Sequence, residues 1–384
     1  MNQFDDIRPY FDSEVRGVLN RLLNDPAFLR LISRFKTPWL AKRAPSLTQW
    51  ATRLLLSARW RHVHNVADLQ QMVARYMAQT VANTTTSLTV NGLEKLSASQ
   101  AYLFISNHRD IVLDPALVNF ALDQAGFPTV RIAVGDNLFK DRLVGEIMRL
   151  NKSFIVKRTF TSPRELRDTF LTLSNYINGS IREGHSIWIA QQEGRAKDGV
   201  DRTDPAIIKM FNMSQKQTGA TLSDVISNLN IVPVSLSYEY DPCDIAKARE
   251  LEMRARTDTY EKTDNEDLHS IVSGITGFKG RVQVSFGEPL TGTYESAKAV
   301  AEAIDVQILR SYQLFPTNYL AYQKLREADP ERVLPAIVPE YSDEQMSAAK
   351  MQFEQRLAQC SPALRPYLLA MYANPVISGL QFDL

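Results

Sequence analysis

Hydrophobic and polar residues follow two different patterns along the chain. From the N-terminus to about residue 85, and again after Pro289, apolar residues recur every three to four positions, as they do on one face of an α-helix. The clearest such stretches are residues 14–32, 66–81, 296–315 and 342–360. Between residues 86 and 290 the pattern changes to short β-branched and aromatic runs separated by helical stretches.

Seven of these short runs predict β-strands. They are residues 87–90, 101–106, 130–134, 153–157, 186–190, 231–238 and 281–286. Ser162-Pro163, Asp204-Pro205 and Asp114-Pro115 predict helix starts, because serine or aspartate before a proline at the first helical position is an N-terminal signature. Strands that alternate with helices indicate crossover connections and an α/β sheet.

The change of pattern predicts three regions. Residues 1–85 are expected to form an N-terminal helical region, residues 86–290 an α/β domain, and residues 291–384 a C-terminal helical cap. A chain of 384 residues is long enough for one large domain or two to three smaller ones with a substantial core.

The composition excludes several classes of protein. With 44% hydrophobic and 23% charged residues, the chain is neither disordered nor fibrous. A net charge of +1 gives no overall attraction to nucleic acid, so no nucleic-acid partner is expected. Two cysteines, Cys243 and Cys360, provide neither a disulfide framework nor metal-ligand spacing. The N-terminus lacks a signal-peptide pattern and no apolar run approaches ~18 residues, which favours a cytoplasmic protein without a spanning helix.

One segment has an unusual mixture of charge and aromatic residues. Residues 30–64 contain eight lysines and arginines, no acidic residue, and three of the four tryptophans, Trp39, Trp50 and Trp60. Basic side chains beside tryptophan and leucine suit a helix that lies on an anionic lipid surface. The alternative is a helix that packs its aromatic side chains on the α/β domain and exposes its arginines to solvent.

His108 is the strongest candidate for chemistry among five histidines. It follows the strand expected at residues 101–106, and ligands usually bind at the carboxyl ends of strands in an open α/β sheet. Asp110 and Asp114 lie close to it in the sequence. A carboxylate bound to one imidazole nitrogen fixes the tautomer and leaves the other nitrogen free to accept a proton.

Two further interpretations of these residues stay open. His108 can be a hydrogen-bonded turn residue, and Asp114, which precedes a proline, can be a helix N-cap. Because no serine or cysteine nucleophile lies nearby, a His–Asp pair here suggests a general base that acts on a substrate hydroxyl rather than covalent catalysis. No second histidine or acidic cluster completes a set of metal ligands around His108, which disfavours a metal-dependent hydrolase.

Two groups of basic residues follow predicted strands. Lys157 and Arg158 end the run NKSFIVKR, and Arg195 and Lys197 lie in the glycine-containing loop QQEGRAKDG. Backbone amides around Gly194 and a nearby guanidinium would form a phosphate-binding site. The alternative for each group is solvated charge at a strand end.

The order of four segments resembles the signature of the phospholipid and glycerol acyltransferase family. The segments are NHRDIVLDP, NKSFIVKR, IAQQEGRAKDG and IVPV, within residues 86–290. The resemblance implies a mixed, mostly parallel sheet flanked by helices, as in glycerol-3-phosphate acyltransferases. It also implies that His108 is a general base oriented by Asp114. Five residues separate the two here, where the family has four, so Asp110 stays an alternative partner.

The resemblance also implies the roles of further residues. The substrate phosphate would be held by Lys157, Arg158, Arg195 and Lys197, with Gly194 shaping the loop. Pro233 would form a wall of the acyl site. The implied reaction transfers a fatty acyl group from acyl-CoA or acyl carrier protein to glycerol-3-phosphate or 1-acylglycerol-3-phosphate, in phospholipid synthesis, without a metal or other cofactor. The protein would act as a peripheral protein at the inner face of the membrane, bound through residues 30–64.

Two alternatives accompany this prediction. The acceptor can be another lipid, such as a lyso-ornithine lipid or a lipid A precursor. The protein can also be a non-catalytic peripheral lipid-binding protein, an alternative motivated by the lengthened gap between His108 and Asp114.

Overall fold

The computed structural model describes residues 3–216, 219–263, 266–328, 335–337 and 341–382. These residues belong to two compact units, each described here by itself. The smaller unit comprises Met1–Tyr76 and Val130–Thr169, and the larger unit comprises Met77–Thr129 and Phe170–Leu384. The three regions expected from the sequence stay a prediction, and residues 329–334, 338–340 and 383–384 of the last region lie outside the described residues.

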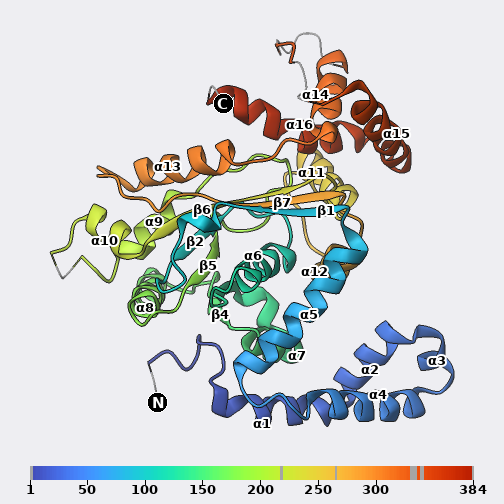
Figure 1. Cartoon of the computed structure of the whole chain (residues 1–384), viewed down its shortest axis with the longest axis vertical. Helices are drawn as coiled ribbons and strands as arrows, with labels where there is room; N and C mark the ends of the chain where they lie inside the picture. The colour runs from blue at the N-terminus through green and yellow to red at the C-terminus, as the bar shows by residue number, and fades with distance from the viewer. Residues whose placement is uncertain (1–2, 217–218, 264–265, 329–334, 338–340, 383–384) are drawn as a thin grey trace. The chain divides into compact units, whose positions relative to one another are not determined.

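The smaller unit is built mainly from N-terminal helices and one pair of strands (Figure 1). Its helices are α1 (Asp12–Leu23), α2 (Pro26–Lys36), α3 (Pro38–Arg43), α4 (Pro45–Trp60), the first part of α5 (Val66–Thr84), η2 (Asp136–Phe139), α7 (Arg142–Leu150) and the start of α8 (Pro163–Arg182). Its strands β3 (Arg131–Gly135) and β4 (Ser153–Val156) are parallel to each other. Both strands were predicted from the sequence.

Local sequence explains why the N-terminal helices begin where they do and what they bury. Asp25 accepts hydrogen bonds from the amides of Ala27 and Phe28, which caps α2. Phe28 packs against Trp60 with ring centroids 5.9 Å apart, inside a core that α1 lines with buried valines and leucines. Trp60 therefore packs within the helical region itself.

The other two tryptophans of residues 30–64 are exposed. Trp39 is 61% and Trp50 60% accessible to solvent. Leu47 and Leu54 share one side of α4 with Trp50 at spacings of three and four residues, and both are exposed. The expectation that the aromatic side chains pack inward therefore fails for Trp39 and Trp50.

The larger unit contains five strands and most of the helices. Its strands are β1 (Ser87–Asn91), β2 (Leu103–Ser106), β5 (Ile187–Ala190), β6 (Ile231–Tyr238) and β7 (Arg281–Phe286). Besides the remainders of α5 and α8, its helices are η1 (Leu93–Lys95), α6 (Leu113–Gln124), α9 (Pro205–Asn212), α10 (Leu222–Asn228), α11 (Asp244–Thr257), α12 (Glu266–Thr276), α13 (Ala297–Arg310), α14 (Pro316–Ala328), α15 (Asp343–Gln359) and α16 (Arg365–Gln381).

The five strands follow the order β1-β7-β6-β2-β5. β2 is parallel to both of its neighbours, β1 is parallel to β7, and only the β6–β7 pair is antiparallel. This arrangement confirms the expected mixed, mostly parallel sheet. β6 is buried along its whole length, which explains its nearly continuous apolar sequence.

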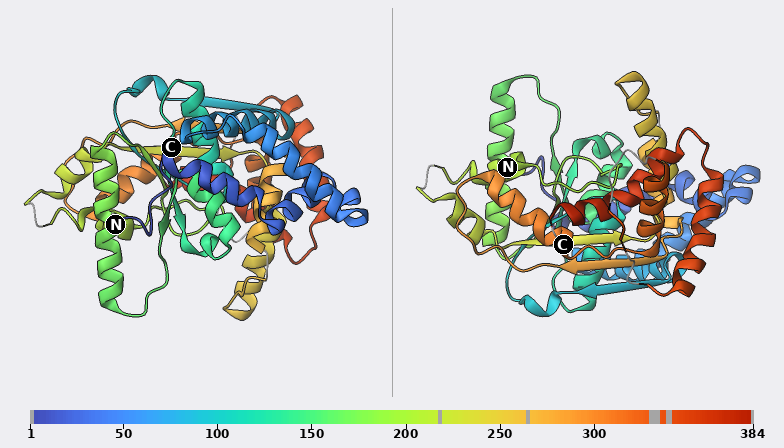
Figure 2. Two further views of the ribbon diagram at one scale, coloured as in Figure 1. Left: turned by 90° about the horizontal axis from the view of Figure 1, so that it is seen from below. Right: turned by 90° about the horizontal axis from the view of Figure 1, so that it is seen from above.

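Helices cover both faces of this sheet. α6 lies on one face, and α13 and α16 lie on the other (Figures 1 and 2). On the α6 side Phe104 contacts Phe286 edge to face, with ring centroids 5.5 Å apart. The two aromatic rings bury a large apolar area at the centre of the unit.

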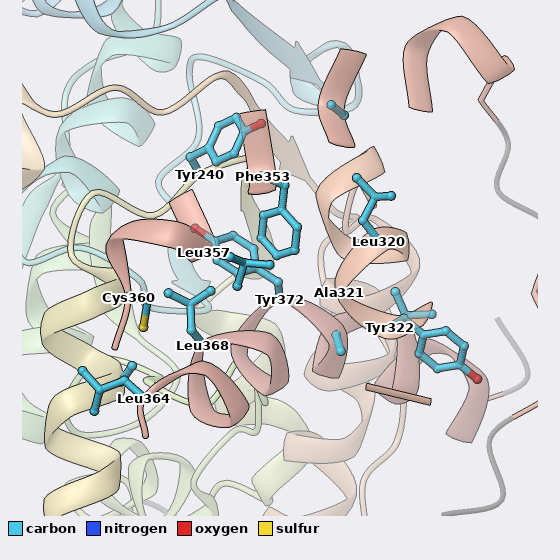
Figure 3. Packing of buried hydrophobic residues seen from close by; sticks show 14 residues of the cluster. Tyr240, Leu320, Ala321, Tyr322, Phe353, Leu357, Cys360, Leu364, Leu368 and Tyr372 are labelled. Carbon is cyan, nitrogen blue, oxygen red and sulfur yellow. The ribbon is translucent and has the colours of Figure 1, made fainter. Parts of the chain in front are cut away.

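The C-terminal helices form a second core around α16. Phe353 of α15 and Tyr372 of α16 meet with ring centroids 5.5 Å apart, and Leu368 is fully buried beside them (Figure 3). After residue 290 the described elements are the helices α13 to α16, and the C-terminal cap as a separate region stays a prediction. α13 ends at Arg310 rather than near residue 315, and α14 begins soon afterwards at Pro316.

Two of the three predicted helix starts are found as expected. Asp204 caps α9 with Pro205 in its first turn, and Ser162 accepts a hydrogen bond from the Glu165 amide at the start of α8. The N-cap predicted at Asp114 is wrong. α6 begins at Leu113, which places Asp114 inside the first turn and leaves its carboxylate available for other contacts.

Candidate active site

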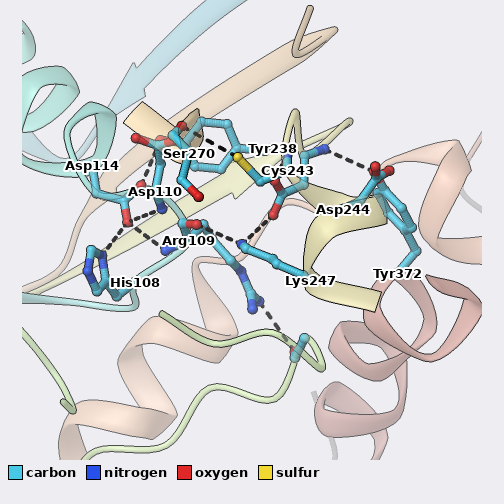
Figure 4. A network of polar contacts seen from close by, with 12 residues as sticks. His108, Arg109, Asp110, Asp114, Tyr238, Cys243, Asp244, Lys247, Ser270 and Tyr372 are labelled. Atoms are coloured by element: carbon cyan, nitrogen blue, oxygen red, sulfur yellow. Dashed lines mark hydrogen bonds and ion pairs between the residues drawn. The ribbon is translucent and has the colours of Figure 1, made fainter. Parts of the chain in front are cut away.

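His108 lies in the turn between the end of β2 and the start of α6. Its Nδ1 is 2.8 Å from Oδ2 of Asp114, and Figure 4 shows the imidazole directed at that carboxylate. Five residues separate His108 from Asp114. α6 starts one residue before Asp114, so the turn between β2 and α6 spans this gap and brings the two side chains together. The lengthened gap between them is therefore compatible with a His–Asp contact.

The Asp114 carboxylate is fully buried and accepts four hydrogen bonds. Besides His108, Oδ2 accepts from the amides of Arg109 at 2.6 Å and Asp110 at 2.9 Å. Oδ1 accepts from the Tyr238 hydroxyl at 2.7 Å. Burial raises the pKa of Tyr238 well above its usual value, and the charge of Asp114 adds to this effect, so the phenol keeps the proton that it donates. These four hydrogen bonds offset the free-energy cost of removing the carboxylate from water.

Asp110 has a different role. Its Oδ1 accepts hydrogen bonds from the amides of Val112 and Leu113, which terminates the turn at the start of α6. Its other oxygen lies against Gly274 of α12, where an added Cβ would be 2.0 Å away. Burial raises the pKa of Asp110, and the nearby Asp114 raises it further. The structure thus places Asp114, and not Asp110, against the imidazole.

The second nitrogen of His108 is available for chemistry. The side chain is 14% exposed, and its Nε2 forms no hydrogen bond within the described part of the chain. Because an ionised carboxylate only accepts, Nδ1 carries the proton and Nε2 carries a lone pair. Trp188 of β5 packs edge-on against the ring at 5.8 Å and donates from Nε1 to Ser106, so the ring has a fixed wall.

The loop that follows β5 meets the His108 turn. The amide of Ala196 donates to the His108 carbonyl at 2.8 Å, so this amide does not face a ligand. Arg195, the preceding residue, is partly exposed and forms no hydrogen bond or ion pair among the described residues. Lys197 is ion-paired with Glu250 of α11, which also pairs with Arg254. The charge of Arg195 helps to lower the pKa of Asp241, but its guanidinium is left without an ion pair in the described chain.

The other predicted phosphate ligands lie in the smaller unit. Lys157 and Arg158 follow β4 and are both exposed. The Arg158 amide donates to Asp136 at 3.4 Å, and its guanidinium lies against Gly135. Their role in binding phosphate stays a prediction.

Pro233 is buried in β6, and its carbonyl accepts from the Gly287 amide at 2.8 Å. Tyr238, five positions further along the strand, faces Asp114. Successive side chains of a strand point to opposite faces, so Pro233 faces the other side of the sheet. This placement gives no support to Pro233 as a wall of an acyl site beside His108.

The described residues lack two kinds of feature. No group of three or more His, Cys, Asp or Glu side chains there is arranged to hold a metal ion. No helix in this part of the chain combines the length and the apolar character needed to cross a membrane. Both cysteines are free and buried.

Sequence reasoning missed three residues that support the site. Tyr238 and Trp188 lie in apolar strands, where an aromatic residue predicts only core packing. Lys247 of α11 is 3% exposed and donates from Nζ to the Arg109 carbonyl at 2.7 Å (Figure 4). A lysine on an amphipathic helix gives no signal that it is buried, so spacing alone could not find it.

Comparison with known families matches the segment of the chain that contains this turn. Residues 87–237 match the family model described as Acyltransferase. This segment is similar to that family, and it covers less than half of the chain. It includes His108, Asp114 and Arg195, and it ends one residue before Tyr238. None of the curated proteins compared with the chain matches it.

Among solved structures, the chain is similar to the crystal structure of the 1-acyl-sn-glycerophosphate (LPA) acyltransferase PlsC from Thermotoga maritima. The match has 12% sequence identity and a TM-score of 0.38, and it covers 74% of this chain and 95% of that chain. A likeness at this TM-score is too weak to support an argument about substrate.

Two glycines of the loop after β5 give a matched test of how the larger unit fixes this loop. Gly194 and Gly199 have φ of +79° and +81°; a Cβ on Gly194 would meet nothing, whereas one on Gly199 would lie 2.0 Å from the Met371 carbonyl of α16. We expect Gly194→Ala to cost about 1 kcal/mol of unfolding free energy through backbone strain alone. Gly199→Ala should lower the thermal unfolding temperature clearly more. Equal decreases in the unfolding temperature of the two variants would contradict a close contact between α16 and this loop.

Proposed function

We propose that the protein transfers a fatty acyl group from a thioester donor, acyl-CoA or acyl carrier protein, to a hydroxyl of glycerol-3-phosphate or its 1-acyl derivative. The observation that carries the proposal is the 2.8 Å contact between His108 and the buried Asp114, with Nε2 of the imidazole left free in a segment similar to the acyltransferase family. A base held in this way suits deprotonation of an alcohol.

The chemistry requires one general base and no covalent enzyme intermediate. Nε2 of His108 accepts the hydroxyl proton while the oxygen attacks the thioester carbonyl carbon. The C–S bond then breaks, and the departing thiolate takes the proton from the imidazolium. Asp114 stabilises the imidazolium through Nδ1 and does not itself exchange the proton. General-base assistance of this kind contributes about 10²–10⁴ in rate.

A phosphorylated acceptor is supported by Arg195, which makes no hydrogen bond or ion pair with its side chain in the described chain and precedes Ala196, the residue that binds the His108 carbonyl. A guanidinium binds phosphate with two parallel hydrogen bonds and would place the acceptor hydroxyl near the base. Lys157 and Arg158 stay further candidates for this contact. The pairing of Lys197 with Glu250 gives it the weakest claim of the four.

The first test is the replacement of His108. We expect His108→Ala to reduce acyl transfer to glycerol-3-phosphate by at least about 10²-fold in kcat while the circular dichroism spectrum is retained, because only the base is lost. His269→Ala, at an exposed position of α12, is the matched control and should keep wild-type kcat. Unchanged activity of His108→Ala would favour the non-catalytic lipid-binding alternative.

The second test concerns the acceptor. Arg195→Ala should raise KM for glycerol-3-phosphate about tenfold or more with little change in KM for the acyl donor, because a charge-assisted contact to phosphate is lost. Lys209→Ala on α9, an exposed basic residue, is the control. An unchanged KM for the phosphorylated acceptor would favour a lipid acceptor without phosphate near its hydroxyl, such as a lyso-ornithine lipid.

We further propose that helices α2 to α4 bind an anionic membrane surface. Residues 30–64 carry eight basic residues and no acid, and large apolar side chains are exposed among them. These are Leu31, Phe35, Trp39, Leu40, Leu47, Trp50, Leu54 and Leu55. Apolar side chains that enter the interface, beside cations that meet lipid phosphates, would bring the enzyme to its lipid product or acceptor.

This proposal predicts salt-dependent binding to vesicles. Wild-type protein should co-sediment with vesicles rich in anionic lipid, less with neutral vesicles, and less as salt is added. Replacing Trp39 and Trp50 by serine should weaken binding to anionic vesicles, whereas Met351→Ser, an exposed position of α15, should not. Equal binding to neutral and anionic vesicles would contradict the electrostatic part of the proposal.

A further inference from the structure

The two residues that flank His108 both bind the same carboxylate oxygen. Arg109 donates from Nη2 to Oδ2 of Asp201 at 2.7 Å, and Asn107 donates from Nδ2 to that oxygen at 3.0 Å. Asp201 lies at the end of the loop that carries Arg195. Arg109 also donates to the Gly199 carbonyl of this loop at 3.3 Å.

These contacts are closed to solvent. Arg109 is 7% and Asp201 5% exposed, and Asn107 is fully buried. Asn107 also exchanges two hydrogen bonds with the backbone of Leu236 in β6, which ties the turn to the sheet. The Ala196–His108 backbone contact is a third link between the turn and the loop. Turn and loop are thus joined at three successive residues around the base.

Burying an ion pair to fix a loop has a large free-energy cost. The cost of removing both charges from water is large enough that two apolar residues of similar volume are often as stable or more so. What the ion pair adds is direction, because Nη2 of Arg109 donates to both Oδ2 of Asp201 and the Gly199 carbonyl, and charge-assisted hydrogen bonds are directional. The ion pair joins the turn that carries His108 to the loop that carries Arg195. Its presence there therefore points to a role in positioning.

We propose that Arg109 and Asp201 are positioning residues for acyl transfer: their ion pair fixes the loop that carries Arg195 relative to the turn that carries His108. The inference rests on the proposed function. When Arg195 holds the acceptor phosphate, the position of the loop decides whether the hydroxyl reaches Nε2. A displacement of about 1 Å at such a site can cost on the order of 10²-fold in rate.

The test compares three variants with the wild-type full-length protein. Asp201→Asn removes the charge and leaves Arg109 buried without its partner. The double variant Arg109→Met with Asp201→Leu replaces the ion pair by apolar side chains. Glu239→Gln disrupts the ion pair between Arg281 and Glu239, one residue past the C-terminal end of β6, 2.7 Å between nitrogen and oxygen, and serves as the matched control. Thermal unfolding, steady-state kinetics with glycerol-3-phosphate, and amide hydrogen exchange of residues 194–201 are measured for each.

We expect Asp201→Asn to lower the unfolding temperature and to reduce kcat/KM for glycerol-3-phosphate by about 10- to 100-fold, with KM for the acyl donor within about twofold of wild type. The apolar double variant should regain unfolding temperature but not kcat/KM, and exchange of residues 194–201 should be faster in both. Glu239→Gln should lose unfolding temperature while its kcat/KM stays within about twofold of wild type.

Two results would overturn the inference: recovery of kcat/KM together with stability in the apolar variant, or a loss in Asp201→Asn no greater than in the control. If wild-type protein transfers no acyl group to glycerol-3-phosphate, the proposed function fails by itself. The exchange measurement then still decides whether the ion pair fixes the loop, since unchanged exchange in Asp201→Asn would refute that.

Discussion

The candidate site depends on a single buried anion, the carboxylate of Asp114. A carboxylate without solvent contact is tolerable only when hydrogen-bond donors replace the lost water, and here four donors do so. Two of them are consecutive amides of the turn, one is the imidazole of His108, and one is the Tyr238 hydroxyl from β6. The demand for these donors fixes the turn, and with it the direction in which Nε2 points.

The same turn is held from the other side by charges of the C-terminal part of the larger unit. Lys247 binds the Arg109 carbonyl and is ion-paired with Asp241. Burial alone would raise the pKa of Asp241, but Lys247 outweighs this effect and lowers it. Next to it, Asp244 accepts from Tyr372 at 2.8 Å and is ion-paired with Arg356. Helices α11, α15 and α16 thus contribute charged and polar side chains next to the turn that carries His108.

The sequence predicted the regular elements well because their signals are local. All seven strands are present near their expected positions, since β-branched runs between turn residues have few other structures available. The contact of His108 with an aspartate was also anticipated, but the N-cap role of Asp114 was not found. That error has a physical source, because Asp110 supplies the capping oxygen and frees Asp114 for the imidazole.

The contacts between residues far apart in the sequence could not be predicted from the spacing of residues along the chain. Asp201 is 92 residues from Arg109, and Lys247 is 138 residues from the same position. Each looks like a surface charge in the sequence, and only the folded chain shows that it is buried. Lys197 and Pro233 match the family signature in residue type, but the signature does not predict their contacts. Lys197 is ion-paired with an acid, and Pro233 faces the side of the sheet opposite to Tyr238.

The position of Tyr238 has a consequence for the modularity of the fold. Its hydroxyl completes the shell of donors around Asp114, yet it stands one residue past the segment that the family model matches, and Lys247 stands ten past it. A fragment that ends at residue 237 would keep every residue of the signature but would lack Tyr238 and Lys247, and so the hydrogen bonds that they donate to Asp114 and to the Arg109 carbonyl. The candidate site is therefore not transplantable as the matched segment alone, and any chimera built from it must carry the chain onward through α11.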